Sequence, residues 1–207
     1  MRNVLLIEPN YKTKFPPIGL MKLATYFKSL GDNVVFYKGE IKDFIIERIT
    51  EKCIATLSSV CPEINWRLKH DTLFQYIRTR KTSYLEELKI RESGIYDFLA
   101  SWIDQFKDYY WKKQYMNPSE REWDWIGVTT MFTFYFDITV KTINEVKGLL
   151  KTDGTLMVGG VLATLQPEKI FEATQVHPFT GLLNKPGIID KDNDTIIDTL
   201  PLDYSIL

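Results

Sequence analysis

The residues of this chain that are best suited to chemistry follow three short apolar runs. They lie in three segments: residues 8–17, 129–135 and 159–164. The middle segment holds Thr129, Thr130 and Thr133, whose hydroxyl groups can donate and accept hydrogen bonds, although threonine is also a routine strand residue. In the last segment Gly159 and Gly160 lack side chains, so either a flat ligand can approach or the chain turns tightly into the next helix. These residue types suit either a ligand site or ordinary strand ends and turns, and no catalytic residue is predicted.

The loops around these residues have unusual compositions. The stretch Asn10-Tyr11-Lys12-Thr13-Lys14-Phe15 combines aromatic and basic side chains. Its lysines either face an anionic group near the N-terminus of the following helix or are simply solvated. Residues 131–136 are strongly apolar and need a cover. A partner domain, a helical part of the chain or a large planar ligand would each supply one.

Other kinds of site find little support in the sequence. His70 and His177 stand outside any HxxxH or Cys/His cluster, so neither is predicted to bind a metal. Cys53 and Cys61 make neither a disulfide scaffold nor a metal site. The spacing suggests no Ser-His-Asp or Cys-His set, and the two glycines do not form a GxGxxG dinucleotide motif.

Length and charge bound the remaining classes. The 207 residues suffice for one well-buried domain with a large insertion. The formal net charge of -1 gives no sign of a dedicated nucleic-acid surface. No apolar run approaches the ~20 residues that a membrane-spanning helix needs. We therefore expect a cytoplasmic protein with no nucleic-acid partner and no membrane partner.

The apolar runs are predicted to be strands of a parallel sheet, which would place the three segments at one edge of it. The expected strands are residues 4–7, 33–37, 125–130, 156–158 and 179–183. The helices that separate them are expected at residues 18–30, 136–150 and 167–173. This alternation predicts an α/β fold of flavodoxin-like or Rossmann-like type, doubly wound, with a mostly parallel five-stranded sheet.

The middle of the chain departs from this alternation, because helical spacing continues where one crossover helix would suffice. Helices are predicted at residues 41–57, 71–80, 83–91 and 95–111. We expect a helical insertion at about residues 60–120 within an α/β domain of residues 1–189. The acidic, polar stretch after Gly187 makes residues 190–207 a predicted linker.

Four short motifs, by their order and spacing, resemble one known family. They are Pro16-Pro17-Ile18-Gly19-Leu20, Gly127-Val128-Thr129, Gly159-Gly160-Val161-Leu162-Ala163-Thr164 and Leu200-Pro201-Leu202-Asp203-Tyr204. Over its first forty residues and from about residue 123 onwards, the chain is similar to the N-terminal cobalamin (B12)-binding domain of B12-dependent radical S-adenosylmethionine (radical SAM) proteins. The last motif looks like that family's linker into its catalytic barrel.

The resemblance implies a cofactor-binding module that holds cobalamin over the C-terminal ends of the strands and is not catalytic alone. Its partner would be a radical SAM barrel domain, in cis or in trans. That barrel would carry the 4Fe-4S cluster and S-adenosylmethionine, because its CxxxCxxC motif is absent from this chain. The residues that the resemblance places around cobalamin are Asn10, Tyr11, Pro17, Gly19, Thr129, Thr130, Thr133, Gly159, Gly160 and Val161.

The chain departs from the family pattern at two points. It lacks the DxHxxG motif that supplies a cobalt ligand in other cobalamin-binding domains, and Val161-Leu162 stand where relatives often have Pro-His. An alternative interpretation is a non-catalytic protein-interaction module with a degenerate B12-binding fold and no cofactor. An FMN domain of flavodoxin type is a third, disfavoured because no Ser/Thr-rich phosphate loop follows the first strand.

Overall fold

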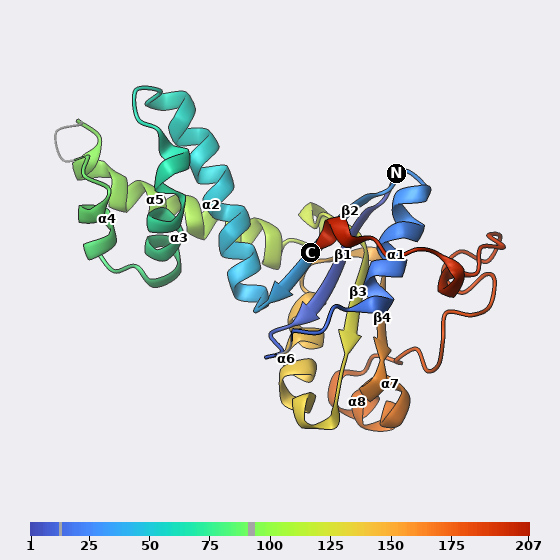
Figure 1. Ribbon diagram of the computed structural model, residues 1–207. Helices are drawn as coiled ribbons and strands as arrows, with labels where there is room; N and C mark the ends of the chain where they lie inside the picture. The colour runs from blue at the N-terminus through green and yellow to red at the C-terminus, as the bar shows by residue number, and fades with distance from the viewer. Residues whose placement is uncertain (13, 91–93) are drawn as a thin grey trace. The chain divides into compact units, whose positions relative to one another are not determined.

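The computed structural model describes residues 1–12, 14–90 and 94–207 (Figure 1). These residues form two compact units. An α/β unit comprises Met1–Glu40 and Pro118–Leu207, and a helical unit comprises Ile41–Asn117. None of the helices among the described residues is long and apolar enough to cross a membrane.

The α/β unit is built on a parallel sheet, which confirms the predicted parallel α/β architecture. Its strands are β1 (Asn3–Pro9), β2 (Asn33–Gly39), β3 (Trp123–Thr130) and β4 (Leu150–Gly160). They lie in the order β2-β1-β3-β4, and every neighbouring pair is parallel. The strand order reverses between β1 and β3, which is the position where open α/β sheets bind ligands.

The predicted fifth strand is wrong, because residues 179–183 form no strand and the described sheet has four. The amide of Phe179 donates to the carbonyl of Val158 in β4 (2.7 Å), but the contact does not extend into a ladder. Pro178 has no N–H to donate, and Gly181 adopts a φ of 104° that an extended strand does not allow. The segment therefore touches the edge of β4 once and then leaves it.

Helices cover both faces of this sheet (Figure 1). The helices of the α/β unit are α1 (Ile18–Ser29), α6 (Phe136–Val146), α7 (Val161–Leu165) and α8 (Pro167–Thr174). Short 3-10 turns occur at Pro118–Glu120, Thr133–Tyr135, Ile197–Thr199 and Tyr204–Ile206. The predicted helix at 136–150 ends early, at Val146, because Leu150 already begins β4.

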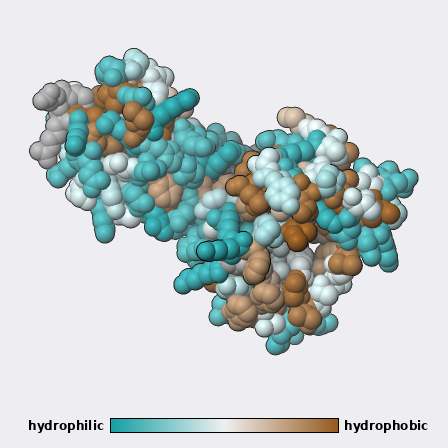
Figure 2. Space-filling view, viewed as in Figure 1, coloured by the Kyte–Doolittle hydropathy of each residue, from teal (hydrophilic) through white to brown (hydrophobic). Residues whose placement is uncertain are grey.

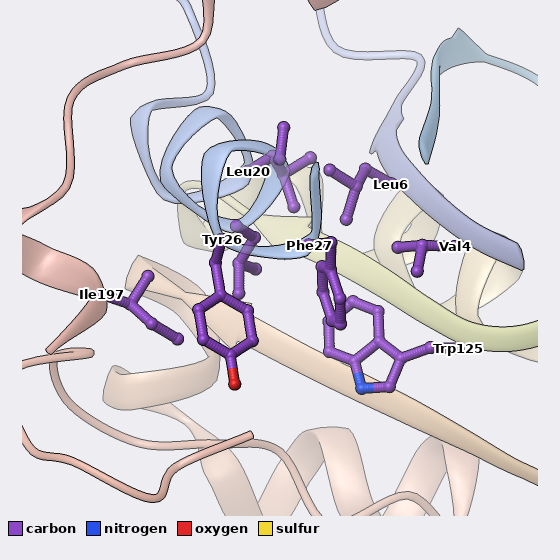
Figure 3. Packing of buried hydrophobic residues seen from close by; sticks show 9 residues of the cluster. Val4, Leu6, Leu20, Tyr26, Phe27, Trp125 and Ile197 are labelled. Atoms are coloured by element: carbon purple, nitrogen blue, oxygen red, sulfur yellow. The ribbon is translucent and has the colours of Figure 1, made fainter. Parts of the chain in front are cut away.

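The core between α1 and the sheet follows from the alternation of side chains along each strand. Val4 and Leu6 of β1 point to the same face as Trp125 of β3, and all three pack under Phe27 of α1 (Figure 3). The rings of Phe27 and Trp125 lie 4.7 Å apart. Ile197, far along the chain, completes this cluster. The fold therefore fixes α1 firmly over β1 and β3.

The C-terminal segment, expected as a linker, lies along α1. The Oγ1 of Thr25 donates to the carbonyl of Pro201 (2.8 Å), and Lys28 pairs with Asp203 (2.6 Å). At the other end of the segment the guanidinium of Arg2 binds Asp190 (2.8 Å). Residues 190–207 are therefore packed on the α/β unit.

The helical unit has its own buried core. Its helices are α2 (Ile41–Val60), α3 (His70–Thr79), α4 (Ser83–Glu87) and α5 (Tyr96–Trp111), with a 3-10 turn at Trp66–Lys69 and a π-helical turn at Lys112–Met116. Ile46, Ile49, Leu73, Ile77 and Ile103 are fully buried. The last residue of the predicted helix at 83–91 lies outside the described residues. α2, which begins before the predicted insertion at about residues 60–120, groups with this unit.

Candidate functional site

A pocket of about 360 Å³ opens at the carboxyl ends of β1, β3 and β4, on the face of the sheet that α1 covers. The first turns of α1 and residues 179–183 form its walls. The lining side chains are mostly apolar, and among them are Leu20, Leu23 and Leu183. Its volume falls within the range of ~300–1,000 Å³ that small-molecule pockets occupy. The chain thus places a ligand-sized cavity at the reversal of strand order.

On the side of the sheet, residues of three adjacent strands line the pocket. Gly127 of β3 and Met157 of β4 are partners in the sheet register, and Glu8 comes from β1. A Cβ at Gly127 would lie 2.6 Å from the indole of Trp125, so that ring already fills the space above this glycine. One step further along the strands, a Cβ at Gly159 would meet only the carbonyl of Phe179, at 3.9 Å. Gly159 therefore leaves open space, which a ligand can use.

Glu8 is the charged residue of β1 that lines this pocket. It is 1% exposed, and its Oε1 lies 2.8 Å from the Nζ of Lys38, its neighbour on β2. Among the described residues, neither oxygen of the Glu8 carboxylate accepts a hydrogen bond of good geometry. The ion pair balances the charge, but Oε2 is left without a donor. A buried acceptor in this state costs stability unless another group reaches it.

Thr130 and Gly160 hold the ends of β3 and β4 together. The backbone N–H of Ala163, in the first turn of α7, donates to the Oγ1 of Thr130 (2.9 Å). Gly160 adopts a φ of 114°, and a Cβ there would lie 2.3 Å from the carbonyl oxygen of Thr130. Both residues line the pocket, but their first role is structural. Thr129, by contrast, is half-buried, and its carbonyl accepts a hydrogen bond from the hydroxyl of Tyr11 (3.4 Å).

Tyr11 lies away from this pocket. Its hydroxyl and the Oγ1 of Thr139 in α6 are 2.6 Å apart, and its ring stacks on Tyr135 at 4.7 Å. Burial raises the pKa of Tyr11 to about 12. Asn10 and Thr133 are both exposed and line no part of the cavity. None of these three predicted binding residues lines the pocket, and Tyr11 packs against α6 instead.

Exposed apolar side chains surround the mouth of the pocket. Phe15 (73% exposed), Val161 and Leu182 (68% exposed) line it and also face solvent; we call these three residues the apolar rim. Phe132 and Phe134, just beyond β3, are exposed as well, and their rings stack 5.5 Å apart. Figure 2 shows apolar side chains gathered at the lower end of the α/β unit, where the strands end. Apolar surface concentrated in this way is typical of binding regions.

Seven of the ten predicted site residues meet at this pocket. They are Pro17, Gly19, Thr129, Thr130, Gly159, Gly160 and Val161. Sequence reasoning missed Glu8, Lys22, Asp198 and the wall at residues 179–183. Glu8 could have been predicted, because it is an acidic residue at the end of an otherwise apolar strand. The sequence did not indicate that residues 179–183 line a pocket, because their apolar side chains suggested a strand.

Among the described residues, nothing points to a metal centre at this site. The described residues contain no group of three or more His, Cys, Asp or Glu side chains that could hold a metal ion. Within that part of the chain neither histidine lines the pocket: His177 is exposed and stacks on Phe171, and His70 belongs to the helical unit.

Comparison of the chain with protein-family models, with curated proteins and with solved structures finds no match. The fold and the pocket are therefore the basis for a functional assignment.

Proposed function

We propose that this chain is a cofactor-binding module that holds cobalamin over the C-terminal ends of its strands. One observation carries the proposal: a cavity of about 360 Å³ with mostly apolar walls opens beside Gly159, at the reversal of strand order. The motifs that resemble the cobalamin-binding domain of radical SAM proteins flank this cavity in space. Pro17 and Gly19 come from one of them, and Gly159 and Val161 from another.

The dimensions of the pocket suit one part of cobalamin. A cavity near the lower end of the usual ~300–1,000 Å³ range accepts the nucleotide tail but not the whole corrin ring. The flat, apolar base of the tail would lie above Gly159, where no side chain interferes, with the hydroxyl of Thr129 available for a hydrogen bond. The corrin would remain outside and cover the apolar rim, which would remove Phe15 and Leu182 from water.

The module contributes binding and positioning. No histidine among the described residues lines the pocket, so this chain would offer no imidazole to the cobalt there. Bound cobalamin would supply a cobalt centre that can carry a methyl group. Catalysis would then require a radical SAM barrel, in cis or in trans, to provide the 4Fe-4S cluster and S-adenosylmethionine. Cys53 and Cys61, both buried, cannot take over that function.

A titration with hydroxocobalamin, followed by gel filtration and visible spectroscopy of the protein peak, tests this proposal. We expect corrinoid to co-elute with the wild-type chain at micromolar protein. The Gly159→Leu variant is the matched control, because its side chain would enter the cavity without meeting protein atoms closer than 3.9 Å at Cβ. Co-elution that is equal for both proteins, or absent from both, contradicts the proposal.

The exposed apolar side chains support a second candidate, a protein-interaction module without a cofactor. Phe132 and Phe134 lie outside the pocket lining, and together with the rim they would suit an apolar partner surface. This candidate predicts a colourless protein after the titration. It also predicts that Phe134→Ser abolishes complex formation while Gly159→Leu has no effect on it.

A further inference from the structure

Glu8 lines the pocket, and its carboxylate is almost completely withdrawn from water. Its 1% exposure leaves no room for a solvent shell, and its Oε2 finds no donor among the described residues. Lys38 lies 2.8 Å from Oε1 and compensates the negative charge. A ligand group that reaches Glu8 therefore needs no positive charge of its own. It needs an N–H or O–H that can donate to the second oxygen.

The surroundings of Glu8 restrict that donor further. Leu20 and Leu23 of α1 line the same pocket, as does Leu183. Walls of this kind suit a flat heterocycle and exclude a strongly hydrated group. The combination of mostly apolar walls with the unpaired acceptor of Glu8 matches an aromatic base that carries an exocyclic amine. Adenine is such a base, because its amine donates two hydrogen bonds and its ring is flat.

We propose that Glu8 makes this pocket selective for a corrinoid whose nucleotide tail ends in adenine, over one whose tail ends in dimethylbenzimidazole. This inference rests on the proposed function. Adenine would donate its amine to the free oxygen of Glu8. Dimethylbenzimidazole, once joined to the ribose, carries no N–H on its ring and would leave the carboxylate in an apolar pocket without a partner. Sites built to hydrogen-bond one group reject an analogue that lacks it, because their own polar atom stays unpaired.

Equilibrium binding of the two corrinoids to the full chain tests the inference. We expect the adenine-tailed corrinoid to bind wild type about 10–100-fold more tightly, the ratio typical for a hydrogen bond to a buried charged group. In Glu8→Leu the ratio should fall to about one, because the acceptor is gone. Glu8→Gln keeps an acceptor without the charge, so it should retain a smaller preference. Glu168→Gln, an exposed position on α8, is the matched control and should behave as wild type.

The outcomes separate this inference from the function on which it rests. Equal binding of both corrinoids to wild type overturns the selectivity by Glu8, but it does not contradict the proposed function as a cofactor-binding module. A preference for the adenine-tailed corrinoid that persists unchanged in Glu8→Leu also overturns the inference, because another group must then bind the adenine. Failure of both corrinoids to bind wild type overturns the proposed function itself. Circular dichroism confirms that each variant is folded before its binding is compared.

Discussion

Two adjacent glycines at the end of β4 should differ in how far the same substitution to alanine lowers stability. Gly160 has φ 114° and ψ -165°, a conformation that only glycine adopts readily. Gly159 has no such constraint, and its Cβ position is open. We therefore expect Gly160→Ala to destabilise the α/β unit, whereas Gly159→Ala leaves its stability nearly unchanged.

The expected loss at Gly160 has two sources. A non-glycine residue in this backbone region costs about 1–3 kcal/mol. In addition, the new methyl group would lie 2.3 Å from the carbonyl oxygen of Thr130, so the ends of β3 and β4 must separate. That movement weakens the hydrogen bond from Ala163 to Thr130, which is worth about 1 kcal/mol. The sum of about 2–4 kcal/mol corresponds to a fall in Tm of roughly 5–15 °C for a chain of this size.

Differential scanning calorimetry is the suitable assay, because it resolves separate transitions if the two units unfold independently. Gly160→Ala should lower the transition of the α/β unit, and Gly159→Ala should keep Tm within about 2 °C of wild type. Equal stability of wild type and Gly160→Ala would refute the backbone argument. A large loss in Gly159→Ala would refute the assignment of open space above that residue.

Three further variants test other parts of the account. Gly159→Leu should abolish corrinoid binding in an equilibrium titration yet keep the wild-type circular dichroism spectrum; retained binding would place the ligand elsewhere. Tyr11→Phe should lower the free energy of unfolding by about 1 kcal/mol in urea denaturation, because the hydroxyl of Thr139 loses one of its two hydrogen bonds, without changing corrinoid affinity. Asp190 accepts hydrogen bonds from Arg2, which holds the pKa of this carboxyl below its usual value against the opposing effect of its burial. Its contribution to stability is therefore present above the unfolded pKa and is lost as the pH falls below about 4. Asp190→Asn should lower the free energy of unfolding at neutral pH and should reduce the further loss of stability between neutral pH and about pH 4. A loss of stability at low pH that equals that of wild type would contradict the pairing with Arg2.

The parallel fold could be predicted from the sequence because its signals are local. Continuous apolar runs at β1 and β3, each followed by a loop of unusual composition, are enough to indicate a parallel sheet with a site at its carboxyl edge. The prediction of a fifth strand was wrong because the tertiary contacts of that segment differ from those of a strand. Residues 179–183 are apolar because they form the wall of the pocket, and Leu183 packs on the core under α1. A short apolar run does not reveal whether it pairs with a strand edge or lines a cavity.

The candidate site was predicted only in part, because the direction of a side chain depends on register and on loop conformation. Gly159 follows directly from the end of β4. Glu8 becomes visible only when the pleat of β1 places its side chain on the same face as Leu6, under α1. Tyr11 follows Glu8 closely in sequence, yet the intervening turn directs its ring toward α6. The local composition does not predict that the side chains of Glu8 and Tyr11 lie on opposite faces of the sheet.

Hydrogen–deuterium exchange of the full chain, with and without a saturating corrinoid, tests the central claim most directly. The account predicts that the cofactor slows exchange in peptides that contain residues 127–131, 157–161 and 179–183, which together enclose the pocket. Peptides from the helical unit, Ile41–Asn117, should exchange at the same rate in both samples. Absence of protection at the strand ends, or protection confined to the helical unit, would contradict a cobalamin site at the carboxyl edge of this sheet.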